Sequence, residues 1–168
     1  IAGKMNPDED ILFMFLTSHG SAQHELVLNQ NAINMRGLAA RDLGEALRAS
    51  RIRWKVLVIS ACYSGGFIDH VKDDNTLVIA MSEFGRTPRI NGHLGRDHWP
   101  EAWSLVTAGC GIKRGLVVGE THASGTYVTT EPYDIGHLFH TWFHALGIDS
   151  TKVEYDNHGQ PLPIANER

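Results

Sequence analysis

Short apolar segments recur along the chain, and each is bounded by polar or turn-forming residues. Several are runs of mainly Val, Ile, Leu, Phe and Met that are too short for typical helices. Apolar runs of this length favour strands buried on both faces, as in a parallel sheet. The predicted strands are residues 11–17, 25–28, 55–60, 76–81, 103–108 and 116–118.

Two longer segments repeat their apolar residues at helical spacing. Residues 36–50 place Leu43 and Leu47 on one side and charged residues on the other, which is the pattern of an amphipathic helix. The apolar residues of 133–146 also share one face, and Gly147 is suited to ending that helix. The sequence therefore predicts helices at both places.

The alternation of strand, helix and strand predicts an α/β fold with a mostly parallel sheet. We expect the sheet to form a three-layer α/β/α sandwich. The sequence changes character after Ser82, because residues 83–101 are rich in Gly, Arg, His and Pro and predict a long loop. Two segments are expected, residues 1–80 and residues 81–168, whose strands are compatible with one common sheet.

The composition of the chain limits the kinds of molecule that it is expected to bind. The 168 residues are 42% hydrophobic and 20% charged, which suits a globular chain with a real core. A formal net charge of -4 and the absence of a basic stripe argue against nucleic-acid binding. No run approaches the roughly 20 apolar residues of a membrane span. The sequence fixes neither the oligomeric state nor the compartment.

Two predicted strands end in residues that can do chemistry. His19 and Gly20 follow residues 11–17, and Cys62 follows residues 55–60. Because parallel strands end at one edge of a sheet, the thiol and the imidazole are expected to meet there. A histidine can take the thiol proton and later protonate a leaving amine, while the N–H groups of Gly20 and Cys62 bind the oxyanion. The alternative is an inert buried cysteine and a turn histidine.

The residues around this pair carry a family resemblance. Thr17-Ser-His19-Gly20-Ser21 and Ser60-Ala-Cys62-Tyr-Ser-Gly65-Gly66 resemble the motifs of legumain-type (C13) cysteine peptidases, which are relatives of caspases. The resemblance covers about residues 8–80. It implies a caspase-like fold, a peptide or protein substrate and no cofactor, with His19 as general base, Cys62 as nucleophile and Gly20 at the oxyanion site. It also implies cleavage after Asn or Asp, or transamidation.

A second resemblance covers about residues 76–168. Ser82-Glu83-Phe-Gly85-Arg86-Thr-Pro88 and Gly95-Arg-Asp97-His98-Trp-Pro100 are similar to the C-terminal part of the DUF1501 family, which belongs with sulfatase and alkaline-phosphatase-like proteins. The resemblance implies a partial phosphatase-like segment with a divalent metal held by Glu83, Asp97 and His98. The alternative is a loop stapled by contacts of Arg86, Asp97 and His98.

Three function hypotheses follow. The first is a cysteine endopeptidase-like hydrolase that uses His19 and Cys62. The second is a metal-dependent phosphatase- or sulfatase-like domain that uses Glu83, Asp97 and His98. The third is an inactive fused remnant that acts as a binding module. The first is favoured because both members of its catalytic pair occur in the chain, although a fold resemblance does not by itself establish activity.

Overall fold

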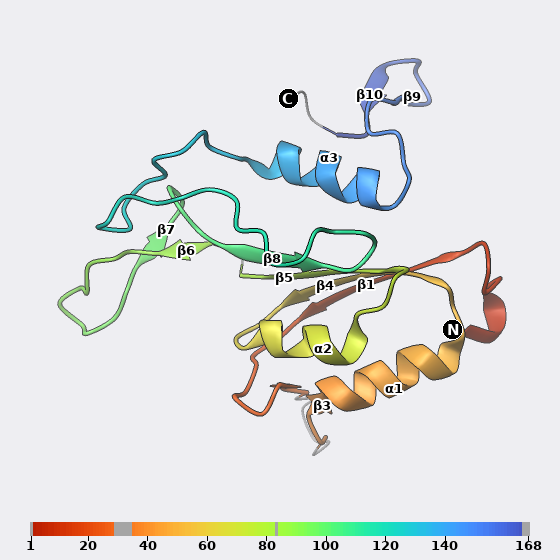
Figure 1. The fold of residues 1–168 in the computed structure, drawn as a ribbon, viewed down its shortest axis with the longest axis horizontal. Helices are drawn as coiled ribbons and strands as arrows, with labels where there is room; N and C mark the ends of the chain where they lie inside the picture. The colour runs from red at the N-terminus through yellow and green to blue at the C-terminus, as the bar shows by residue number, and fades with distance from the viewer. Residues whose placement is uncertain (1, 29–34, 83, 166–168) are drawn as a thin grey trace. The chain divides into compact units, whose positions relative to one another are not determined.

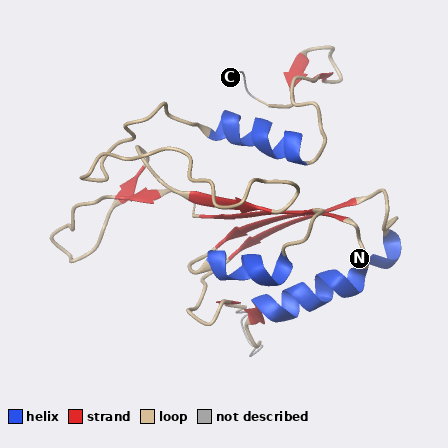
Figure 2. Ribbon diagram, in the orientation of Figure 1, coloured by secondary structure: helices blue, strands red, loops and turns tan. Residues whose placement is uncertain are grey.

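The computed structural model describes residues 2–28, 35–82 and 84–165. The chain divides into two compact units, one ending at Arg114 and one beginning at Gly115. Figure 1 labels the elements in chain order. Figure 2 shows that the first unit contains most of the strand structure, whereas the second is largely loop with one helix and a small hairpin.

A four-stranded sheet forms the centre of the first unit. Its order is β1 (Ile11–Thr17), β4 (Trp54–Ser60), β5 (Thr76–Met81) and β8 (Leu105–Ala108). The first three strands are parallel, and β8 is antiparallel to β5. The prediction of an α/β fold with a mostly parallel sheet is therefore confirmed. The third layer and the phosphatase-like segment stay predictions.

Strand β1 lies at one edge of the sheet and is buried on only one face. Leu12, Met14 and Leu16 pack against the core, whereas Phe13 and Phe15 are 63% and 59% exposed. The prediction that this strand is buried on both faces is wrong. At the edge, the side chains of alternate residues face solvent, whereas every residue of the inner strand β5 except Met81 is buried.

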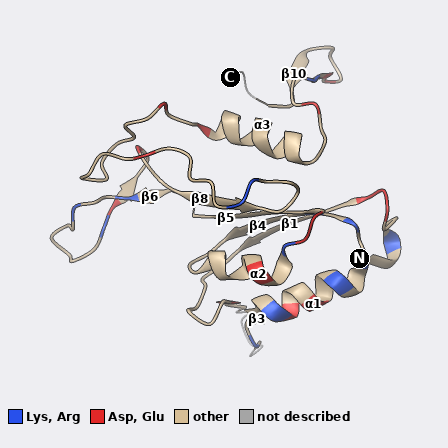
Figure 3. Cartoon of the chain, viewed as in Figure 1, with Lys and Arg blue, Asp and Glu red and all other residues tan. Residues whose placement is uncertain are grey.

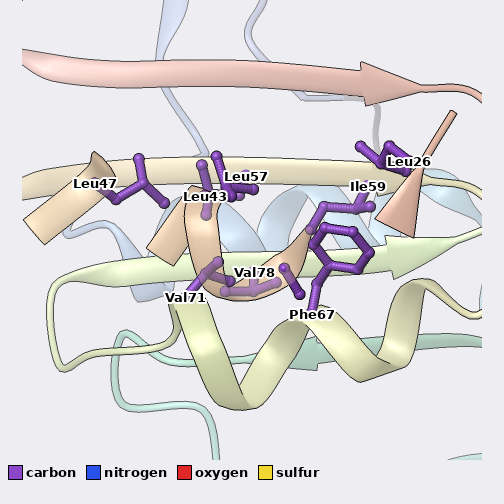
Figure 4. Packing of buried hydrophobic residues seen from close by; sticks show 9 residues of the cluster. Leu26, Leu43, Leu47, Leu57, Ile59, Phe67, Val71 and Val78 are labelled. Atoms are coloured by element: carbon purple, nitrogen blue, oxygen red, sulfur yellow. The ribbon is translucent and has the colours of Figure 1, made fainter. Parts of the chain in front are cut away.

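Two helices pack on the same side of the sheet, α1 (Ala40–Ser50) and α2 (Ile68–Val71) (Figure 1). A 3-10 helix, η2 (Ser64–Phe67), leads into α2. In Figure 4, Phe67 lies beside Ile59, and Leu43 of α1 lies beside Leu57 of the sheet. The buried cluster consists of Leu26, Ala40, Leu43, Leu47, Leu57, Ile59, Phe67, Val71 and Val78.

The helix predicted at residues 36–50 begins later, at Ala40. The two residues that directly precede this helix form β3 (Leu38–Ala39), which pairs with β2 (Glu25–Leu26) in an antiparallel ladder. Their main-chain groups are used by strand pairing, so the helix starts after them. The strand predicted at residues 25–28 is correspondingly shorter. Figure 3 shows basic and acidic residues interspersed along α1, as expected for the outer face of an amphipathic helix.

Lys55 is buried in β4 but is fully paired. Its ammonium donates to two main-chain carbonyl groups at 2.8 and 3.2 Å and lies 3.1 Å from the Asp73 carboxylate. Burial raises the pKa of Asp73, but hydrogen bonds from Thr76, Asn75 and Lys55 outweigh that effect and hold the pKa below its usual value. The Lys55–Asp73 pair lies where β4 and β5 begin, which is the end of the sheet opposite to His19 and Cys62.

The segment predicted as a long loop, residues 83–101, contains a small hairpin. Strands β6 (Gly85–Arg86) and β7 (His98–Trp99) pair in an antiparallel ladder. The prediction missed this hairpin because two-residue strands carry no periodic pattern.

In the second unit, α3 (Ile135–Ala145) matches the predicted helix within two residues at each end. Its N-cap is Asp134, whose carboxylate accepts the His137 N–H at 3.1 Å. Strands β9 (Val153–Tyr155) and β10 (Pro161–Pro163) form a hairpin. The strand predicted at residues 116–118 is wrong, since it has no partner strand in the described ranges and Val117 is 87% exposed. None of the described helices is long and apolar enough to cross a membrane.

Candidate active site

The carboxyl ends of β1 and β4 lie side by side at one edge of the sheet. The strands pair in parallel with Thr17 opposite Ser60, and the Ser18 N–H extends the pairing with a 3.3 Å hydrogen bond to the Ser60 carbonyl. His19 and Cys62 each follow these partners by two residues. His19 and Cys62, the two residues predicted from the sequence, therefore follow the ends of neighbouring strands by the same number of residues.

Gly20 brings the two chain segments into direct contact. A Cβ atom at this position would lie 1.9 Å from the carbonyl oxygen of Cys62 and 2.9 Å from its carbonyl carbon. Any side chain at position 20 would overlap main-chain atoms that cannot rotate away. The main chain that follows His19 thus lies against the main chain of Cys62.

Residues 18–27 fold back as a hairpin that carries His19 and Gly20. The Val27 N–H donates to the His19 carbonyl at 2.9 Å, and the Ser18 hydroxyl donates to the Val27 carbonyl at 2.6 Å. The main chain of His19 is therefore fixed on both sides, although its imidazole is exposed.

A tight turn carries Cys62 away from β4. The Ser64 N–H donates to the Ala61 carbonyl at 3.3 Å, and the Gly66 N–H donates to the Tyr63 carbonyl at 3.1 Å. Tyr63 has a left-handed backbone with φ 56, which is uncommon for a residue other than glycine. The turn leaves Cys62 exposed at the sheet edge.

Two main-chain N–H groups where the two segments meet have no acceptor among the described residues. In the described ranges, neither the Gly20 N–H nor the Cys62 N–H donates a hydrogen bond to another residue. No hydrogen bond there joins the His19 imidazole to the Cys62 thiol. Catalytic hydrogen bonds are often longer in a substrate-free site and shorten on binding.

His24 is a site residue that the sequence analysis missed. Its imidazole packs directly on Gly66, because a Cβ at Gly66 would lie 2.0 Å from the His24 Nδ1 and 2.3 Å from its Cε1. The Nδ1 is buried without a hydrogen-bond partner among the described residues. The sequence signal is weak, since it consists only of a second histidine five residues after His19 and a glycine pair after Cys62.

The second cysteine lies in a different environment. Cys110 is buried, and both cysteines are free thiols. Burial raises the pKa of Cys110, and the Asp73 carboxylate adds to that effect, whereas Lys55 opposes it. Cys110 is therefore suited to serve as the unreactive internal control for Cys62.

Two of the three predicted metal ligands, Asp97 and His98, lie at the start of β7 in the β6–β7 hairpin. Glu83 is outside the described residues. The Asp97 carboxylate accepts a 2.8 Å hydrogen bond from the Asn91 side chain, and the His98 ring stacks on Phe84 with centroids 3.6 Å apart. Across the described ranges, no group of three or more His, Cys, Asp or Glu is arranged to hold a metal ion.

Arginines staple this same loop together. The Arg96 guanidinium donates to the Thr87 carbonyl at 2.7 Å and also to the Pro88 carbonyl. The Arg86 guanidinium donates to the Arg96 carbonyl at 3.2 Å and lies over the Phe84 ring. These contacts hold the Arg86 and Arg96 side chains against the loop itself.

Three histidines of α3 border a shallow hollow of about 340 Å³ in the second unit. The hollow is lined by Tyr133, His137, His140, Thr141 and His144. Two of the imidazoles are engaged, since the His137 Nδ1 lies 2.8 Å from Asp134 and the His140 Nδ1 lies 2.7 Å from the Ser150 hydroxyl. The arrangement is that of a capped helix with a histidine-rich face.

A mainly parallel α/β domain with a cysteine and a histidine at neighbouring strand ends fits the class of cysteine-peptidase-like proteins. Comparison with family models agrees, since residues 4–87, half of the chain, match the Peptidase C13 family. Residues 65–168 match DUF1501, a family described as a protein of unknown function. The chain therefore belongs to the Peptidase C13 family through its N-terminal half and to DUF1501 through its C-terminal part.

The family matches confirm the two resemblances found in the sequence. They overlap at residues 65–87, a range that contains α2 and β5. No curated protein and no solved structure matches the chain significantly.

Proposed function

We propose that this protein is a cysteine endopeptidase-like hydrolase that cleaves peptide bonds through Cys62 and His19. The observation that carries the proposal is the contact of Gly20 with the main chain of Cys62. This contact brings the segment after β1 and the segment after β4 together at the sheet edge where ligands of parallel α/β folds bind.

The chemistry follows from the two side chains. His19 takes the proton of the Cys62 thiol, and the sulfur attacks the carbonyl carbon of the peptide bond. The protonated imidazole then donates that proton to the leaving amine, which frees the new N-terminus. Water, activated by the neutral imidazole, hydrolyses the thioester and restores the thiol.

The tetrahedral intermediate needs donors for its oxyanion. The N–H groups of Gly20 and Cys62 suit this role, because neither donates a hydrogen bond elsewhere in the described ranges. Main-chain donors are fixed before the reaction, so they cost little reorganisation as negative charge develops. The Gly20 contact with Cys62 keeps the two peptide units adjacent.

The family resemblance supports two finer features. We propose a caspase-like three-layer sandwich for the peptidase part and cleavage after Asn or Asp. The mechanism requires no metal or other cofactor, because the thiolate, the imidazole and the main-chain donors supply the nucleophile, the base and the oxyanion site.

The metal-dependent alternative has less support. Asp97 is hydrogen-bonded to Asn91, and His98 is stacked on Phe84, so the contacts of both residues are explained by the structure of the loop. We therefore keep the phosphatase- or sulfatase-like activity, and the binding-module hypothesis, as outcomes of the test and not as a second proposal.

The test is hydrolysis of fluorogenic peptides with Asn or Asp before the scissile bond. Cys62→Ala is expected to abolish cleavage, and His19→Ala is expected to lower it by at least about 100-fold. Cys110→Ala is the matched control, since this thiol is buried and lies near Asp73, at the end of the sheet opposite to Cys62. Iodoacetamide should label Cys62 well before Cys110, whose pKa is raised by burial.

The outcomes separate the hypotheses. Cleavage that survives in Cys62→Ala contradicts the proposal. Hydrolysis of a phosphate or sulfate ester that depends on added divalent metal, and that is lost in His98→Ala, supports the metal-dependent alternative. Wild-type protein that binds the peptides without cleaving them supports the binding module.

A further inference from the structure

We propose that His24 is a positioning residue for Cys62, and that its imidazole acts as a packed spacer between the hairpin of residues 18–27 and the turn of residues 62–66. The proposal rests on the proposed function, because it assigns His24 a role only relative to Cys62 as the nucleophile. It goes beyond the Cys62–His19 pair by naming what holds the turn in place.

The His24 ring lies in very close contact with Gly66. The His24 ring occupies the space of a side chain at position 66, with Nδ1, Cε1 and Cγ at 2.0, 2.3 and 2.4 Å from the Cβ that Gly66 lacks. Position 66 therefore accepts only glycine as long as the ring is present. The shape of the ring and the absence of a side chain at position 66 therefore depend on each other.

The backbone of His24 is held firmly by hydrogen bonds to its neighbours. Its N–H donates to the Ser21 carbonyl at 3.0 Å, and its carbonyl accepts the N–H of Ala40, the first residue of α1, at 2.9 Å. Its backbone is left-handed, with φ 59. Two residues later, Leu26 is buried in the core at 2% exposure. The ring thus projects from a backbone that cannot shift easily.

The turn of residues 62–66 is held at two places. Gly20 lies against the Cys62 carbonyl at its start, and His24 lies on Gly66 near its end. Phe67, the next residue, is fully buried in the core. The exposed thiol therefore sits on a short segment that is fixed on both sides, which is the support a nucleophile needs for a precise attack geometry.

The contact between His24 and Gly66 is a packing contact and not a hydrogen bond. Because the His24 Nδ1 is buried and has no hydrogen-bond partner in the described ranges, this nitrogen contributes no polar bond that substitution would break. Replacing an unsatisfied polar group by an apolar group of similar shape is close to neutral or stabilising. The role of His24 therefore lies in the shape of its ring, and phenylalanine should fulfil it.

The experiment compares His24→Ala, His24→Phe, Gly66→Ala and the double variant His24→Ala/Gly66→Ala. The readouts are kcat and KM for peptide cleavage and the rate at which iodoacetamide alkylates Cys62 between about pH 6 and pH 9. His24→Ala is expected to lower kcat by about 10-fold or more, with little change in KM, because a displaced nucleophile loses attack geometry. His24→Phe is expected to retain most of kcat.

The glycine variant tests the contact itself. Gly66→Ala should lower kcat because its methyl group collides with the ring, whereas the double variant should recover part of that loss because the ring is gone. Gly65→Ala and His70→Ala are the matched controls. Gly65 has nothing within 4 Å of its missing Cβ, and the His70 side chain is exposed. Both controls are expected to match wild type.

The results separate this proposal from the proposed function. If cleavage depends on Cys62 but His24→Ala matches wild type in kcat and in the alkylation profile, the positioning role is overturned and the peptidase stands. If the wild-type protein cleaves nothing, the proposed function fails, and the alkylation profile still decides the role of His24. If His24→Ala does not fold, the loss in Gly66→Ala and the retention in His24→Phe decide it. A His24→Phe variant as impaired as His24→Ala also overturns the proposal, because shape would then not suffice.

Discussion

The contact of Gly20 with Cys62 makes Gly20→Ala the most direct perturbation of the candidate site. The new methyl carbon would lie 1.9 Å from the Cys62 carbonyl oxygen, and ordinary contact begins near 3.4 Å. One of the two chain segments must therefore move by about 1.5 Å, the difference between these two distances. Because both contact atoms belong to the main chain, no side-chain rotation can relieve the overlap.

The size of this shift sets the expected effects. Overpacking of a close contact costs typically about 1–3 kcal/mol in the free energy of unfolding. For a chain of this length, each kcal/mol lowers the Tm by about 2–4 °C. A displacement of about 1 Å in a catalytic geometry lowers the rate by about 100-fold. Gly20→Ala should therefore lower the rate of peptide cleavage by about 100-fold and the Tm by about 2–12 °C, so the loss of cleavage is measured on protein that is still folded.

The assay measures kcat/KM on the fluorogenic peptides and the Tm of the same preparations. Gly65→Ala is the matched control, since an added Cβ there meets nothing within 4 Å. It should keep its activity, and its Tm should stay within a few degrees of wild type, because an alanine in a helical turn costs nothing relative to glycine. If Gly20→Ala cleaves peptide as fast as Gly65→Ala does, the contact is not needed for the site, and the reasoning from it is refuted.

Two further predictions concern stability, and both are measured by urea denaturation. Phe67→Ala should lower the free energy of unfolding by about 3–5 kcal/mol, because this side chain is fully buried, whereas Phe13→Ala, at 63% exposed, should change it by less than about 1 kcal/mol. Asp73→Asn should cost about 1 kcal/mol at neutral pH, because it weakens the 3.1 Å pair with buried Lys55 but the Asp73 side chain is 45% exposed and screened by solvent, while Asp74→Asn should cost little. Since the folded-state pKa of Asp73 is lowered, its contribution is present above the unfolded value near 3.8 and is lost as the pH falls below it; a cost of Asp73→Asn that persists undiminished at lower pH would contradict this assignment.

The hydrophobic pattern of the sequence was sufficient to predict the inner strands and to predict that His19 and Cys62 follow strand ends. Strand β5 has the predicted bounds, and β4 begins one residue earlier than predicted. Continuous apolar runs identify such strands because every residue is buried on one face or the other. Since the ends of parallel strands share an edge, His19 and Cys62 were correctly expected to follow neighbouring strands.

The remaining features depend on contacts between distant segments, which a local pattern does not contain. The exposure of Phe13 follows from the edge position of β1, and the late start of α1 follows from the pairing of β3 with β2. The contact of His24 with Gly66 joins residues 42 positions apart in the sequence. Histidine and glycine each have many local roles, so their pairing becomes apparent only once the hairpin is seen to fold back onto the turn.

Strand β5 explains how two family segments can meet without disturbing the candidate site. The two family matches overlap at residues 65–87, and β5 lies within that range, parallel to β4 on one side and antiparallel to β8 on the other. The junction is closely packed, because a Cβ at Gly109, just after β8, would lie 1.8 Å from the Thr76 carbonyl oxygen. Gly20, His24 and the turn that carries Cys62 lie within residues 4–87. In this chain the next strand of the sheet, β8, pairs with β5 on the side opposite to β4, away from the ends of β1 and β4 that His19 and Cys62 follow.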